Sequence, residues 1–196
     1  LVGLIIMSIG FLALANIWPM LATLLTALAG LPILWDHMHT YQKNRVLAFL
    51  DPSNDPTGDG WHTRQSIFAV GSGKVTGKGF MSGTQTHLEF IPERTTDFIF
   101  AAFCEEFGLA GVIVLLVAFT FLIFRGLMIA AEAPTVFTRL LAGAMTLSLF
   151  SYAFVNMGMV SGIVPVVGVP LPFISYGGTA MVTLGFALGI LMSISN

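Results

Sequence analysis

The residues best able to carry out chemistry lie in one hydrophilic segment, Asp36 to Asp97. This segment holds 13 of the 18 charged side chains, and both signs are present. Carboxylates can take up protons as general bases, and Arg and Lys can stabilise a departing anion. The alternative is a solvated loop with scattered ion pairs, each contributing about 0–1 kcal/mol.

Three acids stand next to a long apolar run. In Thr95-Thr96-Asp97-Phe98 a threonine could cap a helix, and Asp97 would then lie in its first turn and complement the helix dipole. Glu105 and Glu106 would lie about 12 Å further along that helix. Since a charge at membrane depth is costly, we expect at least one of the two to face a partner or a polar cavity.

The stretch from Gly71 to Gly79 contains four glycines and two lysines, a composition that could bring backbone N–H groups and positive charge to a phosphate. It does not fit a Walker A loop, because Ser72 replaces the first required glycine and Gly79 stands where Ser or Thr should be. It does not fit a dinucleotide-binding turn either, because Thr76 takes the third glycine position. A flexible loop is the expected structure.

Several other classes of site are disfavoured. The four histidines have no zinc-ligand spacing, Cys104 has no second cysteine to pair with, and no serine nucleophile motif is present. A formal net charge of −2 gives no basic surface for nucleic acid.

The elements that must position these residues are membrane helices. Hydrophobic residues make up 56% of the 196 residues and charged ones only 9%, against roughly 25% charged in an ordinary soluble domain. The fold class predicted is therefore an all-α polytopic membrane protein. The expected membrane segments are residues 1–14, the end of a helix cut by a fragment boundary, and four further helices: 18–35, 98–124, 137–160 and 175–196.

The connections between these helices set the expected topology. Residues 36–97 form a large loop, 125–136 a short one, and 161–174 a segment with too much Pro and Gly for a helix but too apolar for solvent. We expect 161–174 to dip into the membrane as a re-entrant segment. Because the short loop carries Arg125 and Arg139 against Glu132, it should be cytoplasmic, which places 36–97 and 161–174 on the extracytoplasmic side.

Ordered phrases along almost the whole chain resemble the SEDS family (shape, elongation, division, sporulation), and within it the RodA branch more than the FtsW branch. The phrases are Tyr41-Gln42-Lys43-Asn44-Arg45, Gly77-Lys78-Gly79, Pro92-Glu93-Arg94-Thr95-Thr96-Asp97-Phe98, Glu105-Glu106-Phe107-Gly108, Asn156-Met157-Gly158-Met159 and Pro170-Leu171-Pro172-Phe173-Ile174-Ser175-Tyr176-Gly177-Gly178. Phe107 and Thr95 depart from the family's commoner Leu and His. The resemblance implies the last four to five of ten helices.

The resemblance also implies an activity: a glycosyltransferase of the bacterial inner membrane that polymerises lipid II into peptidoglycan and releases undecaprenyl diphosphate. Its expected partner is a class B penicillin-binding protein. Asp97 matches the family's essential acid and is the expected catalytic base, and Arg45, Lys78, Glu93 and Glu105 are expected to bind the diphosphate or sugar. A divalent cation could assist the leaving group. The alternatives are a lipid II flippase and a noncatalytic scaffold of the elongation machinery.

Overall fold

The computed structural model describes residues 25, 29–30, 35–50, 59–80, 82–83 and 95–195, and all the regular secondary structure in these residues is helical. The chain divides into two compact units, Leu1–Leu47 and Ala48–Asn196. The predicted segments 1–14 and 18–35 lie almost entirely outside the described residues. The fold class, an all-helical membrane protein, is confirmed.

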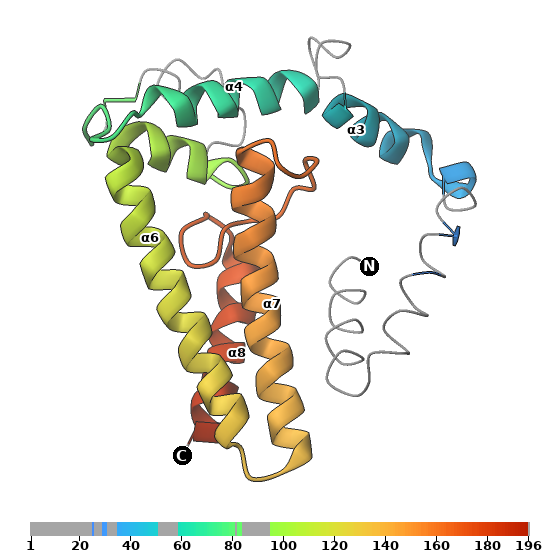
Figure 1. Cartoon of the computed structure of the whole chain (residues 1–196), viewed down its shortest axis with the longest axis vertical. Helices are drawn as coiled ribbons and strands as arrows, with labels where there is room; N and C mark the ends of the chain where they lie inside the picture. Colours follow the sequence, from blue (N-terminus) through green and yellow to red (C-terminus); the bar gives the residue numbers. More distant parts are fainter. Residues whose placement is uncertain are drawn as a thin grey trace. The chain divides into compact units, whose positions relative to one another are not determined.

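Three helices of the second unit are long and apolar enough to cross a membrane (Figure 1): α6 (Ile99–Glu132), α7 (Val136–Val160) and α8 (Gly178–Ser195). α6 and α7 run antiparallel, joined by a short connection at Ala133–Thr135. Close packing is possible at Gly126, where a Cβ would collide with Thr146 of α7. Many of their other large apolar side chains are exposed, including Val114, Phe121 and Phe137, as suits a lipid-facing surface.

Helix α6 differs from the predicted membrane helix 98–124 in two ways. α6 continues past Phe124 to Glu132, because Arg125 does not prevent helix formation and a long charged side chain can reach the interface from within a helix. α6 also bends sharply at Gly108, whose φ of 63° and ψ of −163° are not helical. Residues 99–107 therefore form a short arm that lies across the end of the α6–α7 pair (Figure 1).

Two helices lie within the segment expected to be a loop. They are α3 (Thr40–Leu50) and α4 (Asp59–Ser72). In α4 the buried residues Thr63, Ser66 and Ala69 recur every third position, so one face of the helix is made of small side chains that pack closely on α6 and α7. That short face of small and polar residues lacks the hydrophobic contrast by which amphipathic helices are recognised in a sequence.

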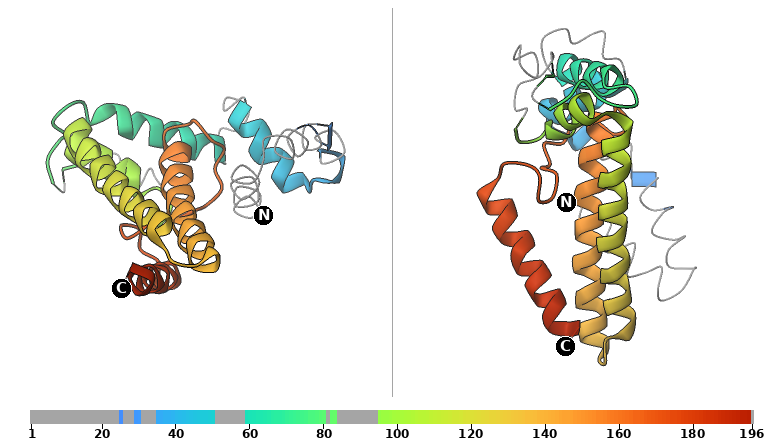
Figure 2. Two further views of the ribbon diagram at one scale, coloured as in Figure 1. Left: turned by 60° about the horizontal axis from the view of Figure 1, so that its bottom comes forward. Right: turned by 90° about the vertical axis from the view of Figure 1, so that its left-hand side faces the viewer.

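α7 ends in a Schellman motif, which terminates the helix and begins an irregular segment. Gly162 has a φ of 74°, its N–H donates to Met159 O, and Ile163 N–H donates to Gly158 O. Residues 161–177 then form an irregular segment beside α7 that leads into α8 (Figure 2). Leu171 and Pro172 in this segment are fully buried.

Candidate functional site

Asp97 lies in a turn, Thr95–Phe98, which we call the acidic turn. Helix α6 begins only at Ile99, with Phe98 as its N-cap and no side-chain cap. The expectation that Asp97 would lie in the first turn of the helix is therefore wrong. Asp97 therefore lies just outside the helix, and its position depends on the contacts of the turn.

Three consecutive backbone carbonyls of the acidic turn accept hydrogen bonds from distant parts of the chain. Tyr176 N–H donates to Thr95 O (2.8 Å), Ser175 Oγ donates to Thr96 O (2.6 Å), and Asn156 Nδ2 donates to Asp97 O (2.8 Å). The turn is thus held by α7 and by the segment 161–177. Because the backbone is fixed at three successive residues, the direction of the Asp97 side chain is restricted as well.

The Asp97 carboxylate lies against Gly168. A Cβ built at Gly168 would be 3.2 Å from Asp97 Oδ2, which is tighter than an ordinary van der Waals contact. Gly168 also has a φ of 74°, in the left-handed region that other residues adopt only at a cost. The close approach of this backbone to the acid therefore depends on glycine.

Two of the predicted substrate-binding residues bind each other. Lys78 Nζ lies 2.6 Å from Glu105 Oε1, and Lys78 N–H donates to the Glu105 carbonyl (3.0 Å). The Glu105 side chain is fully buried, whereas that of Lys78 is 30% exposed. The expectation that one of the two glutamates would face a partner is confirmed for Glu105. Because the helix bends at Gly108, Glu105 lies on the short arm of α6 and not further along a continuous helix.

The glycine-rich stretch is an ordered turn, and the expectation of a flexible loop is wrong. Its Gly79 N–H donates to Glu106 O, and its Lys74 and Val75 carbonyls accept from Leu109 and Ala110 N–H. Cβ atoms at Gly73, Gly77 and Gly108 would each collide with backbone atoms of the opposite segment. The glycines therefore allow two backbones to pack directly on each other, and the N–H groups of Lys78 and Gly79 are already bonded to carbonyls instead of being open to a phosphate.

The remaining predicted site residues are Arg45 and Glu93. Arg45 belongs to the first unit, where its guanidinium lies 4.5 Å from the centre of the Tyr41 ring. Glu93 lies outside the described residues. Within the part of the chain that the structure describes, no three His, Cys, Asp or Glu side chains are grouped to hold a metal ion.

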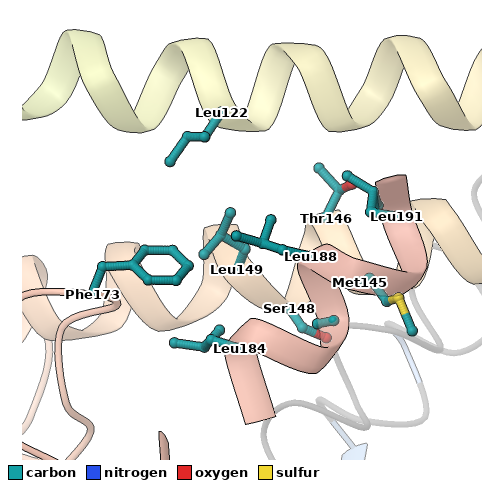
Figure 3. A pocket seen from close by; sticks show the side chains of 10 residues that line it. Leu122, Met145, Thr146, Ser148, Leu149, Phe173, Leu184, Leu188 and Leu191 are labelled. Atoms are coloured by element: carbon teal, nitrogen blue, oxygen red, sulfur yellow. The ribbon is translucent and has the colours of Figure 1, made fainter. Parts of the chain in front are cut away.

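A separate apolar pocket of about 130 Å³ lies between α6, α7 and α8 (Figure 3). Five of its ten lining residues are leucines, and Phe173 lies at one end. Its two polar residues on α7, Thr146 and Ser148, donate their hydroxyls to helix carbonyls at Ala142 and Ala144. With no titratable side chain in its lining, this pocket offers no group for acid or base catalysis.

Asn156 and Ser175 both occur in the family phrases, but no role was predicted for either residue. A signal for Asn156 was present, because an amide side chain in the apolar run of residues 137–160 is costly unless it is bonded inside the protein. No comparable signal exists for Ser175, since serine is common in irregular segments.

The sequence pattern of the FtsW/RodA/SpoVE family, described as cell cycle proteins, matches residues 1–196. The chain belongs to this family. It is 58% identical over 167 residues to the peptidoglycan glycosyltransferase MrdB (RodA) of Escherichia coli K12, a match that covers 85% of this chain and 45% of that protein. A probable FtsW of Geobacter metallireducens is 44% identical over 156 residues, covering 80% of this chain and 41% of that protein.

A solved structure shares the fold as well. It is a peptidoglycan synthase complex studied for the coordination of polymerization and crosslinking, and one of its chains matches with a TM-score of 0.70 and 30% identity. The match covers 91% of this chain and 49% of that one. The chain thus spans about half the length of the relatives it matches, and it is a multi-pass membrane protein of the SEDS family.

Proposed function

We propose that this chain is part of a peptidoglycan glycosyltransferase that polymerises lipid II into glycan strands during cell elongation. The 58% identity to a protein named as a peptidoglycan glycosyltransferase carries the proposal. The acidic turn supports it, because glycosyl transfer requires a base near the acceptor hydroxyl and Asp97 is held at a fixed place on the protein.

In the proposed reaction an acceptor sugar hydroxyl attacks the anomeric carbon of the donor. The new carbon–oxygen bond forms as the bond to the diphosphate breaks, Asp97 takes the hydroxyl proton, and undecaprenyl diphosphate leaves with the bonding electrons. Cationic side chains favour this departure, because negative charge grows on the leaving group. Arg45 is the proposed diphosphate contact, and Glu93 is proposed to contact the sugar.

Lys78 and Glu105 enter the proposal as a pair. Glu105 is fully buried, so its proposed task is to hold Lys78 and the bend at Gly108, while the exposed part of the Lys78 side chain could still approach an anionic head group. A divalent cation could share the leaving-group role.

The proposal is tested by incubating purified full-length protein and a class B penicillin-binding protein with lipid II and measuring glycan strands on a gel. Moenomycin is added to exclude contaminating synthases of another class. We expect polymerisation without any ion gradient. Transfer of fluorescent lipid II between leaflets with no glycan formed would support a flippase instead, and neither activity would support a scaffold.

We expect Gly168→Ala to reduce both the rate of glycan synthesis and the stability of the protein. The left-handed φ costs a residue with a Cβ about 1–2 kcal/mol, and the added methyl crowds Asp97 Oδ2. Since a displacement of about 1 Å can cost up to about 100-fold in rate, a loss of about 10-fold or more is expected. The measurement is the polymerisation rate together with the unfolding temperature.

Gly143→Ala is the matched control for Gly168→Ala. Gly143 lies within α7 and an added Cβ meets no atom within 4 Å. Alanine is preferred there over glycine by about 0.5–1 kcal/mol, so rate and stability should be at least parental. Parental rates in both variants would argue against a crowded carboxylate.

We also propose the bacterial inner membrane as the location, with the segment 36–97 on the extracytoplasmic side. α4 and the acidic turn lie at the end of the α6–α7 pair opposite to Ala133–Thr135 (Figure 1), which supports opposite sides for the two regions. In a background lacking Cys104, Ser82→Cys should react with an impermeant thiol reagent added to intact spheroplasts, and Glu132→Cys should be protected. The reverse labelling would place the proposed chemistry in the cytoplasm.

A further inference from the structure

Asn156 joins two segments that meet at the acidic turn. Its side chain is fully buried near the end of α7. One nitrogen, Nδ2, donates to Asp97 O at 2.8 Å and to Val169 O at 2.6 Å. The same amide therefore binds the residue that carries the proposed base and the residue that follows Gly168, against which the Asp97 carboxylate lies.

The chemistry of the two contacts requires an amide. Both partners are backbone carbonyls, which only accept hydrogen bonds, and the NH2 group of asparagine supplies two donors from one atom. An aspartate of nearly the same shape would place acceptor against acceptor, and a leucine would supply no donor. Asn156 Oδ1 is buried without a hydrogen-bond partner among the described residues, so the amide oxygen adds no hydrogen bond at this site. The two donors are what the asparagine adds.

The end of α7 gives Asn156 a firm support. Ser66 Oγ of α4 donates to Val160 O of α7 at 3.0 Å, and a Cβ at Gly162 would lie 2.6 Å from Ile67 of α4. α4 and α7 are thus in direct contact one turn beyond Asn156. The amide is held by packed helices, whereas the segments it binds are irregular.

Ser175 forms a second hydrogen-bonded link of the same kind. Its Oγ donates to Thr96 O at 2.6 Å and accepts from Leu171 N–H at 2.6 Å. Like Asn156, it links the acidic turn to the segment 161–177 through a backbone carbonyl. Both residues bond to backbone carbonyls of the acidic turn and not to the Asp97 carboxylate.

We propose that Asn156 is a positioning residue of the transferase: its amide holds the backbone of Asp97 and, through Val169, the backbone beside Gly168. Ser175 supports the same turn through Thr96. The inference rests on the proposed function, because it gives Asn156 its role through the base. Asn156 is not placed in contact with the substrate. Its loss should therefore impair the catalytic step and leave substrate affinity almost unchanged.

The first test is Asn156→Asp in full-length protein with its penicillin-binding partner. We expect kcat for lipid II polymerisation to fall about 10- to 100-fold, the range for a displaced catalytic group, with KM within about twofold of the parent. Ser151→Ala is the matched control on the same helix, because the Ser151 hydroxyl donates only to Leu147 O of its own helix; it should keep the parental kcat. Parental kcat in Asn156→Asp would overturn the inference.

The second test is a double-mutant cycle with Asp97→Asn. If Asn156 acts through Asp97, Asn156→Asp should reduce the residual rate of Asp97→Asn by less than about twofold, because coupled residues are not additive. A further loss of 10-fold or more would mean that Asn156 acts on stability or on another group, and would overturn the inference. If Asp97→Asn itself keeps the parental rate, the failure belongs to the general-base assignment.

A third comparison serves if Asn156→Asp does not fold. Ser175→Ala removes the second link, and Ser175→Thr retains a hydroxyl at the same place. We expect a reduced kcat at parental KM in Ser175→Ala and recovery of at least half the parental kcat in Ser175→Thr. Equal kcat in all three proteins would show that the links to the acidic turn do not affect catalysis.

Discussion

Asp97→Asn is expected to reduce glycan synthesis at least about 100-fold, because an amide cannot take up a proton at neutral pH and loss of a general base costs about 10²–10⁴ in rate. The polymerisation rate of the purified complex, measured at saturating lipid II, checks this. Asp36→Asn is the matched control: it makes the same chemical change at an exposed position, and its rate should be parental.

The fold of Asp97→Asn should be intact. Asp97 precedes the N-cap of α6, so no first-turn charge is lost, and Asn156 bonds to the backbone oxygen of residue 97, which the substitution leaves in place. Expression, unfolding temperature and co-purification of the partner should match the parent. A near-parental rate would reject the base assignment, and Glu93 would become the next candidate ahead of Glu105, which is buried and paired.

Lys78→Met is expected to destabilise the protein by about 3 kcal/mol. Removing one partner of a buried ion pair leaves the other charge uncompensated, which costs about 3–5 kcal/mol, and the lower end applies because the Lys78 side chain is 30% exposed. The unfolding temperature and the yield of folded protein measure this loss. Arg45→Ala provides the contrast, since we expect it to slow polymerisation at subsaturating lipid II with little change in yield.

The double variant Lys78→Met/Glu105→Leu separates structure from substrate binding. Replacing both charges by apolar groups removes the uncompensated carboxylate, so most of the stability should return. If the double variant is stable but inactive, Lys78 also contacts the substrate. If it is stable and active, the pair serves the bend at Gly108 alone. Parental stability of Lys78→Met would contradict the energetic importance of the pair.

Much of the helical framework could be predicted because membrane helices are encoded by local hydropathy. The expected helix 137–160 differs from α7 by one residue at its start, and 175–196 contains α8 (Gly178–Ser195). The error in α6 has a specific cause. Gly108 stands in an apolar run that reads as one helix, and its left-handed φ becomes necessary only because the backbone of Gly77 packs against it.

The candidate site was predicted in part. Asp97 was identified through its motif, but the local pattern alone favoured a place in the first turn of a helix, whereas α6 starts two residues later. Lys78 and Glu105 were each identified as important and were both assigned to substrate binding. Their ion pair joins residues 27 positions apart, a separation for which neither helix nor strand periodicity gives any signal.

The sequence by itself determined that this is a helical membrane protein of the SEDS family and that its charged residues gather beside the membrane helices, because hydropathy and ordered motifs are properties of the linear chain. Tertiary structure decided which of those residues meet. Asn156 reaches Asp97 across 59 positions, and Ser175 reaches Thr96 across 79. Such contacts depend on how α7 and the segment 161–177 pack, and the hydrogen-bonding side chains that make them carry no periodic pattern in the sequence.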